Sequence, residues 1–299
     1  MISSTPAGYP ETMQQLLVCT DLDRTLLPNG TEPESPGARE YFAALIASDE
    51  ISLAYVSGRH RALVEEAIEA YCLPWPDFVI GDVGTTIYEI DSKHDWKLCT
   101  DWEQFISHDW NGQRHDGLAR ILEGIDTLQL QPEDRQNSFK LSYFAPLNCD
   151  RETLSAVIQQ RLTQADIKAN LIWSIDEPAA TSLLDILPVQ ASKYHAIEAL
   201  QQRQGFDNHH TVFSGDSGND IEVLASPIPS VLVANSQPDV RQQADRLARA
   251  QGLSEQLYIA RGGFLGMNGN YSAGILEGIA HYHPWILDYL TGEEAMTPR

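Results

Sequence analysis

The sequence predicts an α/β protein whose core is a doubly wound parallel sheet with a second, α+β domain inserted into it. Three observations favour this fold. Short apolar runs such as residues 16–20 (LLVCT) are typical of parallel strands that are buried on both faces. These runs alternate with stretches of helical period near both ends of the chain, which indicates strand–helix–strand crossovers. The alternation stops in the middle of the chain, so we expect a separate unit there.

The N-terminal part of the chain begins with a polar stretch that carries two prolines, residues 1–14, and we interpret it as a loose leader. The elements that follow are predicted from apolar runs and from apolar residues at helical spacing. They are strands at 16–20, 51–56 and 78–80, a helix at 36–47, and a second helix that ends near residue 70. Turn-rich stretches separate these elements, as expected for a sheet with short connections.

The middle of the chain carries a different mixture of elements. Strands are predicted at 140–144, 171–174 and 183–186, and helices at 115–125 and 151–164. After it the alternation resumes, with helices at 193–203, 218–225, 237–248 and 272–281 and strands at 211–214, 230–233 and 257–260. We therefore expect a core domain of residues 1–84 and 189–299, interrupted by an inserted α+β cap of residues 85–188.

The excess of acidic residues excludes some classes of binding partner. Against 20 lysines and arginines stand 42 acidic residues, which gives a formal net charge of −22. Such a field repels nucleic acid and acidic membrane surfaces, and it requires any anion site to be built locally. The four cysteines form no CxxC pair, and the sequence shows no signal peptide and no apolar run of the ~20 residues that a membrane span needs. We expect a protein of the reducing cytoplasm.

Polar side chains follow three of the predicted parallel strands. Asp21-Leu22-Asp23-Arg24-Thr25 follows the first strand, Ser57-Gly58-Arg59 the second, and Gly215-Asp216-Ser217-Gly218-Asn219-Asp220 the strand at 211–214. Lys193 begins the helix that comes after the insert. Ligands of an open parallel sheet bind where its strands end, so we expect these groups to lie together.

The carboxylates in these segments predict a metal site. Asp21, Asp216 and Asp220 would repel one another at one point unless a cation lay among them. Magnesium prefers oxygen ligands and keeps water and substrate phosphate in its shell, so Mg²⁺ suits such a site.

The remaining groups suit phosphate chemistry. Ser57 and Gly58, at a helix N-terminus, offer a hydroxyl and amides to an anion, and Lys193 can balance its charge. The Asp21 carboxylate can attack phosphorus, which divides a hydrolysis into two easier steps. Asp23 can protonate the leaving oxygen and then activate water.

The motifs DLDRT, SGR, a lysine after an insert, and GDSGND, in that order, resemble those of the haloacid-dehalogenase-like phosphatases. FKLSYF at 139–144 and AGILEGIAHY at 273–282 are similar to segments of sucrose-phosphate phosphatase and its relatives. The resemblance implies a Rossmann-like core, a cap that closes over a sugar, and phosphate-monoester hydrolysis through an aspartyl phosphate.

The resemblance also implies a role for each matching residue. Asp21 would be the nucleophile and Asp23 the general acid/base, with its backbone carbonyl on the metal. The residues that would hold the phosphoryl group are Ser57, Gly58, Lys193 and Asn219, and those that would complete the magnesium site are Asp216 and Asp220. Two further residues stay open: Arg59 is a solvated helix residue or a substrate contact, and Lys140 lies on a solvated strand face or serves the sugar phosphate or the cap.

Several substrates fit these features. The first expectation is a small phosphorylated sugar, sucrose 6-phosphate or a close glycosyl phosphate. Alternatives are a phosphatase of the same architecture for mannosylfructose phosphate or mannosyl-3-phosphoglycerate, and a phosphosugar mutase that returns the phosphoryl group to its sugar. The resemblance also makes an association with a sugar-phosphate synthase plausible.

Overall fold

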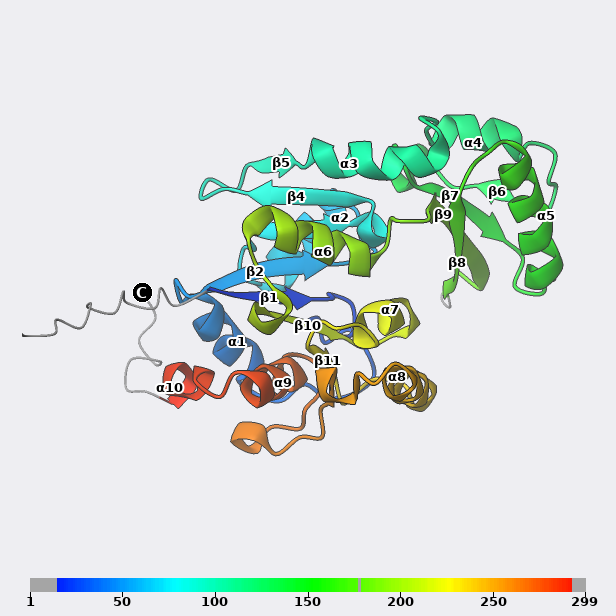
Figure 1. The fold of residues 1–299 in the computed structure, drawn as a ribbon. Helices are drawn as coiled ribbons and strands as arrows, with labels where there is room; N and C mark the ends of the chain where they lie inside the picture. The colour runs from blue at the N-terminus through cyan, green and yellow to red at the C-terminus, as the bar shows by residue number, and fades with distance from the viewer. Residues whose placement is uncertain (1–14, 177–178, 292–299) are drawn as a thin grey trace, which may run out of the picture.

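The computed structural model describes residues 15–176 and 179–291, which form two β-sheets with helices around them (Figure 1). The larger sheet has eight strands in the order β12-β11-β10-β1-β2-β3-β4-β5, and the smaller has four in the order β6-β7-β9-β8. The leader expected at residues 1–14 lies outside the described residues. No helix in the described ranges combines the length and the apolar character that crossing a bilayer requires.

The larger sheet is parallel from β12 to β3. Its strands are β1 (Leu16–Thr20), β2 (Ile51–Val56), β3 (Phe78–Gly81), β4 (Thr86–Ile90), β5 (Trp96–Leu98), β10 (Thr211–Gly215), β11 (Ser230–Leu232) and β12 (Leu257–Ile259). The central strand β1 pairs with β10 on one side and β2 on the other, with Val18 opposite Val212 and Leu53. The carboxyl ends of β1, β2 and β10 therefore meet at one edge.

Helices cover both faces of this sheet, which explains why its strands are apolar throughout. Leu16 and Val18 pack on one face with α1 (Ala38–Ile46), α2 (Arg61–Tyr71), α9 (Ser272–Tyr282) and α10 (Ile286–Thr291). Leu17 and Cys19 pack on the other face with α3 (Thr100–Ser107), α6 (Lys193–Gln204), α7 (Ile221–Leu224) and α8 (Pro238–Ala250). The predicted doubly wound α/β core is confirmed.

The smaller sheet is antiparallel and lies to one side of the larger one (Figure 1). Its strands are β6 (Gln129–Leu130), β7 (Leu141–Ala145), β8 (Ala169–Asp176) and β9 (Thr181–Pro188). Two helices, α4 (His115–Ile121) and α5 (Arg151–Gln164), pack against β7 and β8. This unit is the α+β arrangement expected for the insert.

The first boundary of the insert differs from the one expected at residue 85. Residues 86–98 form β4 and β5, which extend the larger sheet by antiparallel pairing, because the chain turns back on itself after β3 and places Ile87 opposite Ile80. The helix α3, which the sequence reasoning did not predict, then leads toward the smaller sheet (Figure 1). The division into two domains stays a prediction, with residues 86–98 assigned to the core sheet.

Gly84 lies where the turn after β3 packs against the start of α6. It belongs to a short 3₁₀ turn, Asp82–Gly84, and has a φ of +97°, which glycine tolerates best. A Cβ added there would lie 2.9 Å from the Lys193 backbone nitrogen and closer still to the Ser192 carbonyl group. The chain between β3 and β4 is thus packed directly on the first turn of α6.

We predict that Gly84→Ala destabilises the protein by about 1–3 kcal/mol more than Gly124→Ala, because only the first substitution forces backbone against backbone. Gly124 has a φ of +78° and open space around its Cα, so it controls for the backbone strain alone. Denaturant unfolding of both variants measures the difference, and equal losses would contradict the close packing inferred here.

Candidate active site

Four segments bring their polar side chains together at the carboxyl edge of the larger sheet. Asp21 directly follows β1, and Ser57 directly follows β2. Asp216 follows β10, and Lys193 is the first residue of α6. Asp220 ends the short turn after Asp216, so one loop contributes two of the carboxylates.

The three aspartates expected to hold a cation form one cluster. Single carboxylate oxygens from Asp21, Asp216 and Asp220 lie within 4.8 Å of one another, and all three residues are buried. Burial raises the pKa of Asp21 to about 8, with Lys193 opposing the shift and the other two aspartates adding to it. Burial and the neighbouring Asp220 raise the pKa of Asp216 to about 6. The cluster is therefore short of positive charge, and its hard oxygen donors fit Mg²⁺.

Lys193 is the buried cation of the site. Its Nζ lies 3.2 Å from Asp21 Oδ1, donates to Asp220 Oδ1 at 2.6 Å and donates to Asn219 Oδ1 at 3.4 Å. Burial alone would lower the pKa of Lys193, but Asp21 and Asp220 outweigh it and raise the pKa, so the amine stays protonated. Within the described residues Asp21 Oδ2 accepts no hydrogen bond, which leaves this oxygen for a ligand.

Asp220 has a structural part in the same cluster. Its Oδ2 accepts from the backbone nitrogens of Asp216 and Ser217, each at 3.0 Å, and its Oδ1 accepts from Lys193. These bonds connect the loop after β10 to the start of α6. Asp216 has other partners. Its Oδ1 accepts a hydrogen bond from Thr25 Oγ1 at 3.3 Å, and its Oδ2 lies 3.4 Å from Arg24 Nε.

Asp23 and Arg59 form an ion pair at the rim of the cluster. Arg59 donates from Nε to Asp23 Oδ2 at 2.8 Å and from Nη2 to Asp23 Oδ1 at 2.6 Å. Asn29 donates to the same carboxylate at 2.7 Å. Burial raises the pKa of Asp23, but the bonds from Arg59 and Asn29 outweigh it and hold the pKa below its usual value. Sequence reasoning left Arg59 as a solvated or substrate-binding residue and did not foresee this partner.

Ser57 and Gly58 form the turn that was expected to receive the phosphoryl group. The Ser57 side chain is buried, and its Oγ accepts from the Arg59 backbone nitrogen at 3.2 Å. The Gly58 nitrogen donates to no group in the described part of the chain, and Gly58 is exposed. A free amide beside a buried hydroxyl suits an anion.

Lys140 does not reach the acidic cluster. It is buried, donates to the Arg135 carbonyl at 3.0 Å, and its Nζ lies 3.7 Å from Asp82 Oδ1 and 3.8 Å from Asp185 Oδ1. Asp82 follows β3 of the core, whereas Asp185 lies in β9 of the smaller sheet. The lysine therefore ties the two sheets together rather than lying on a solvated face.

Three residues of the site were missed as functional candidates. Arg24 and Thr25 hold Asp216, and Asn29 holds Asp23. Thr25 is part of the DLDRT motif, so the motif itself was a signal for it. Nothing in the local sequence marks Asn29, because its partner is fixed only when the turn after β1 folds.

Comparison with known proteins places these features in a family. The family model of sucrose-6F-phosphate phosphohydrolase matches residues 14–283. A protein from Nitrosococcus oceani, named only as a HAD-like hydrolase, is 54% identical over 94% of this chain and 76% of its own length. The mannosylfructose-phosphate phosphatase of Agrobacterium fabrum is 30% identical over 89% of this chain and 96% of its own.

A solved structure is also similar. The sucrose-phosphatase of Synechocystis sp. PCC6803, in complex with sucrose and phosphate, superposes with a TM-score of 0.68 at 27% identity. The match covers 90% of this chain and 98% of that one. It therefore includes both the larger and the smaller sheet.

The cluster predicts a specific response to magnesium. We expect Asp216→Asn to leave the metal-free protein at least as stable as the wild type, because it removes one of three crowded carboxylates. The rise in melting temperature with added Mg²⁺ should shrink, because stabilisation by a ligand follows its affinity for the folded state. Thermal unfolding across a magnesium titration measures both effects.

The exposed Asp126→Asn serves as the control for loss of one negative charge. It should keep the full magnesium response. An unchanged response in Asp216→Asn would show that the ion binds elsewhere.

Proposed function

Because this chain belongs to the sucrose-6F-phosphate phosphohydrolase family, we propose that it hydrolyses a disaccharide phosphate, with sucrose 6-phosphate as the first candidate. The family and the relatives identify the chain as a phosphoric monoester hydrolase of the HAD-like type. The observation that carries the proposal is the contact of Lys193 with both Asp21 and Asp220, which fixes a carboxylate with one free oxygen at the sheet edge.

The first half of the reaction follows from that arrangement. The free oxygen of Asp21 attacks phosphorus, the bond from phosphorus to the sugar oxygen breaks, and Asp23 gives its proton to the leaving sugar. Lys193 and the amide of Gly58 bind the phosphoryl oxygens as charge gathers on them. Magnesium, held by Asp21, Asp216 and the Asp23 carbonyl, would supply positive charge to the same oxygens.

The second half reverses the roles of the two carboxyl groups. Asp23 takes a proton from water, the water oxygen attacks phosphorus, and the bond to the Asp21 oxygen breaks. Inorganic phosphate leaves, and both side chains regain their starting state. Asp220 was expected to complete the magnesium site, but both of its oxygens accept hydrogen bonds from Lys193 and from the loop after β10. Its proposed role is therefore to position the cation and the metal-binding loop.

The pairing of Asp23 with Arg59 sets a condition on this reaction. The ion pair favours the charged carboxylate, whereas donation to the leaving oxygen requires a proton on Asp23. Asp23 must therefore leave Arg59, take a proton from solvent and turn toward the substrate before the bond to the sugar breaks. The released guanidinium then lies at the rim of the site, where it can bind the substrate.

The smaller sheet is proposed to select the sugar. Lys140 joins it to the core beside Asp82, and Asn137 donates to Thr85 at 2.8 Å, so the sheet is held close to the edge where the strands end. The relatives act, by their names, on sucrose phosphate and mannosylfructose phosphate, and both names support a disaccharide substrate. Association with a sugar-phosphate synthase stays a prediction.

The decisive experiment measures phosphate release from sucrose 6-phosphate, mannosylfructose phosphate and mannosyl-3-phosphoglycerate, with and without Mg²⁺. We expect one disaccharide phosphate to be strongly preferred, and Asp21→Asn to lose at least about 10³-fold in rate, since the amide is no nucleophile. Asp126→Asn, which lies far from the site in sequence and is exposed, should keep full activity.

Three other outcomes would change the proposal. Equal slow release from all three substrates would leave the mechanism but remove the disaccharide specificity. Phosphate transfer to the sugar in the presence of a sugar bisphosphate, without release, would identify a mutase. Full activity in Asp21→Asn would refute the nucleophile.

A further inference from the structure

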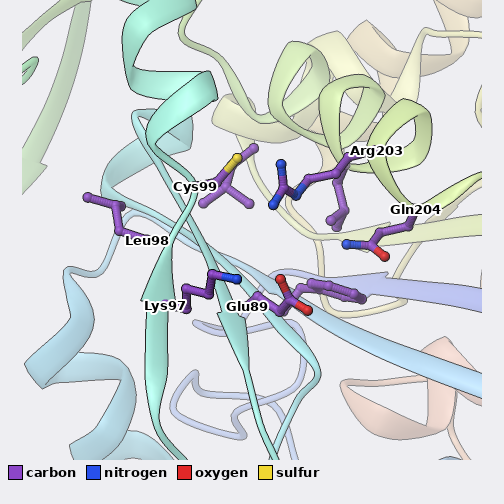
Figure 2. A pocket seen from close by; sticks show the side chains of 9 residues that line it. Glu89, Lys97, Leu98, Cys99, Arg203 and Gln204 are labelled. Atoms are coloured by element: carbon purple, nitrogen blue, oxygen red, sulfur yellow. The ribbon is translucent and has the colours of Figure 1, made fainter.

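A groove lies between α3 and α6, separate from the acidic cluster. It has a volume of about 560 Å³, which is in the range of sites that bind small molecules. Side chains of both helices line it, among them Trp102, Phe105, Glu198, Ala199, Gln202 and Arg203. A smaller cavity between β4, β5 and α6 adjoins it and shares Ile87, Cys99 and Arg203, and Figure 2 shows Arg203 reaching from α6 toward Cys99.

The groove has one aromatic wall. Phe105 is 49% exposed, and its ring stacks on that of Trp102 with 5.7 Å between the ring centroids. Trp102 is itself buried, so Phe105 presents the open face. An exposed aromatic ring of this kind contacts the apolar face of a sugar or another flat molecule.

The polar side chains of the groove carry no excess of positive charge. Arg203 is paired with Asp101 at 3.3 Å, and Glu198 accepts from Tyr194 at 2.7 Å. The side-chain amides of Gln190 and Gln202 have no hydrogen-bond partner within the described residues. With two carboxylates against one guanidinium, the groove does not favour a phosphate. The free amides and the carboxylates are suited to hydroxyl groups.

The groove is connected to the catalytic lysine through two contacts. Trp102 donates from Nε1 to the Gly84 carbonyl at 3.0 Å, and Gly84 packs on the backbone of Ser192 and Lys193. The opposite wall is α6 itself, whose first residue is Lys193. Gln190, in the segment that returns from the smaller sheet, lines the same groove. A ligand here would therefore touch both the catalytic helix and the connection between the two sheets.

We propose that this groove is a second binding site, for a neutral polyhydroxylated ligand of the size of a disaccharide. The unphosphorylated sugar that the reaction releases is such a ligand. The identification of this sugar as the ligand rests on the proposed function. A sugar bound between α3 and α6 contacts Trp102 and Gln190. These contacts change how the smaller sheet closes over the acidic cluster. The site thereby links the turnover of the enzyme to the amount of free sugar.

The test separates this site from the active site by filling the latter first. Asp21→Asn protein with Mg²⁺ is titrated calorimetrically with sucrose 6-phosphate, and the saturated complex is then titrated with sucrose. We expect saturable binding of sucrose in the second titration. Ala199→Trp, which fills the groove, should abolish it, and Phe105→Ala should weaken it about ten-fold through loss of the exposed ring. Gln243→Trp, on the exposed side of α8, should bind like the parent.

Each result decides between the proposals. A silent second titration after a normal first one overturns the second site, and so does sucrose binding that both groove variants retain. A silent first titration counts against the proposed substrate alone, because the loss of sucrose binding in Ala199→Trp and its weakening in Phe105→Ala, beside normal binding in Gln243→Trp, still report on the groove. In the active enzyme, sucrose should alter kcat with the wild type and have no effect on kcat in Ala199→Trp.

Discussion

The structure depends on burying three carboxylates and one ammonium group at a single edge of a parallel sheet. Unpaired charges in a protein interior cost several kcal/mol each, and here Lys193 contacts Asp21 and Asp220 at once while Arg24 lies beside Asp216. The other features follow from that need. The backbone nitrogens of Asp216 and Ser217 serve Asp220, and the turn at Gly84 packs on the start of α6 to fix the lysine.

The buried cation matters because the rest of the protein is strongly acidic. A chain with a formal net charge of −22 repels phosphorylated molecules over most of its surface. The buried ammonium group of Lys193 and the free amide of Gly58 oppose that repulsion at one place, and the clustered carboxylates would add a divalent ion to them. The smaller sheet is fastened near this edge by another buried cation, because Lys140 joins it to Asp82. The few buried cations thus oppose the net charge at one edge of the larger sheet and tie the smaller sheet to it.

The sequence allowed the core and most of the candidate site to be predicted, because both depend on local patterns. An apolar run such as 16–20 is expected where both faces of a strand are covered. The polar residues that follow adjacent parallel strands then lie at the same edge of the sheet. The pairings made at long range could not be predicted in this way. The strands β4 and β5 were assigned to the insert, since nothing local shows that residues 86–98 return to β3. The partners of Arg59 and Lys140 lie 36 and 58 positions away in sequence, and only the fold brings them together.

The loop after β10 and the buried lysine depend on the same side chain. Asp220 accepts from two backbone nitrogens of its own loop and from Lys193, so the loop holds its shape through hydrogen bonds to the protein. Asp220 thereby couples the position of the Lys193 ammonium group to the course of the loop that carries Asp216. A displacement of either one displaces the other, so the cation and the loop move as a single body.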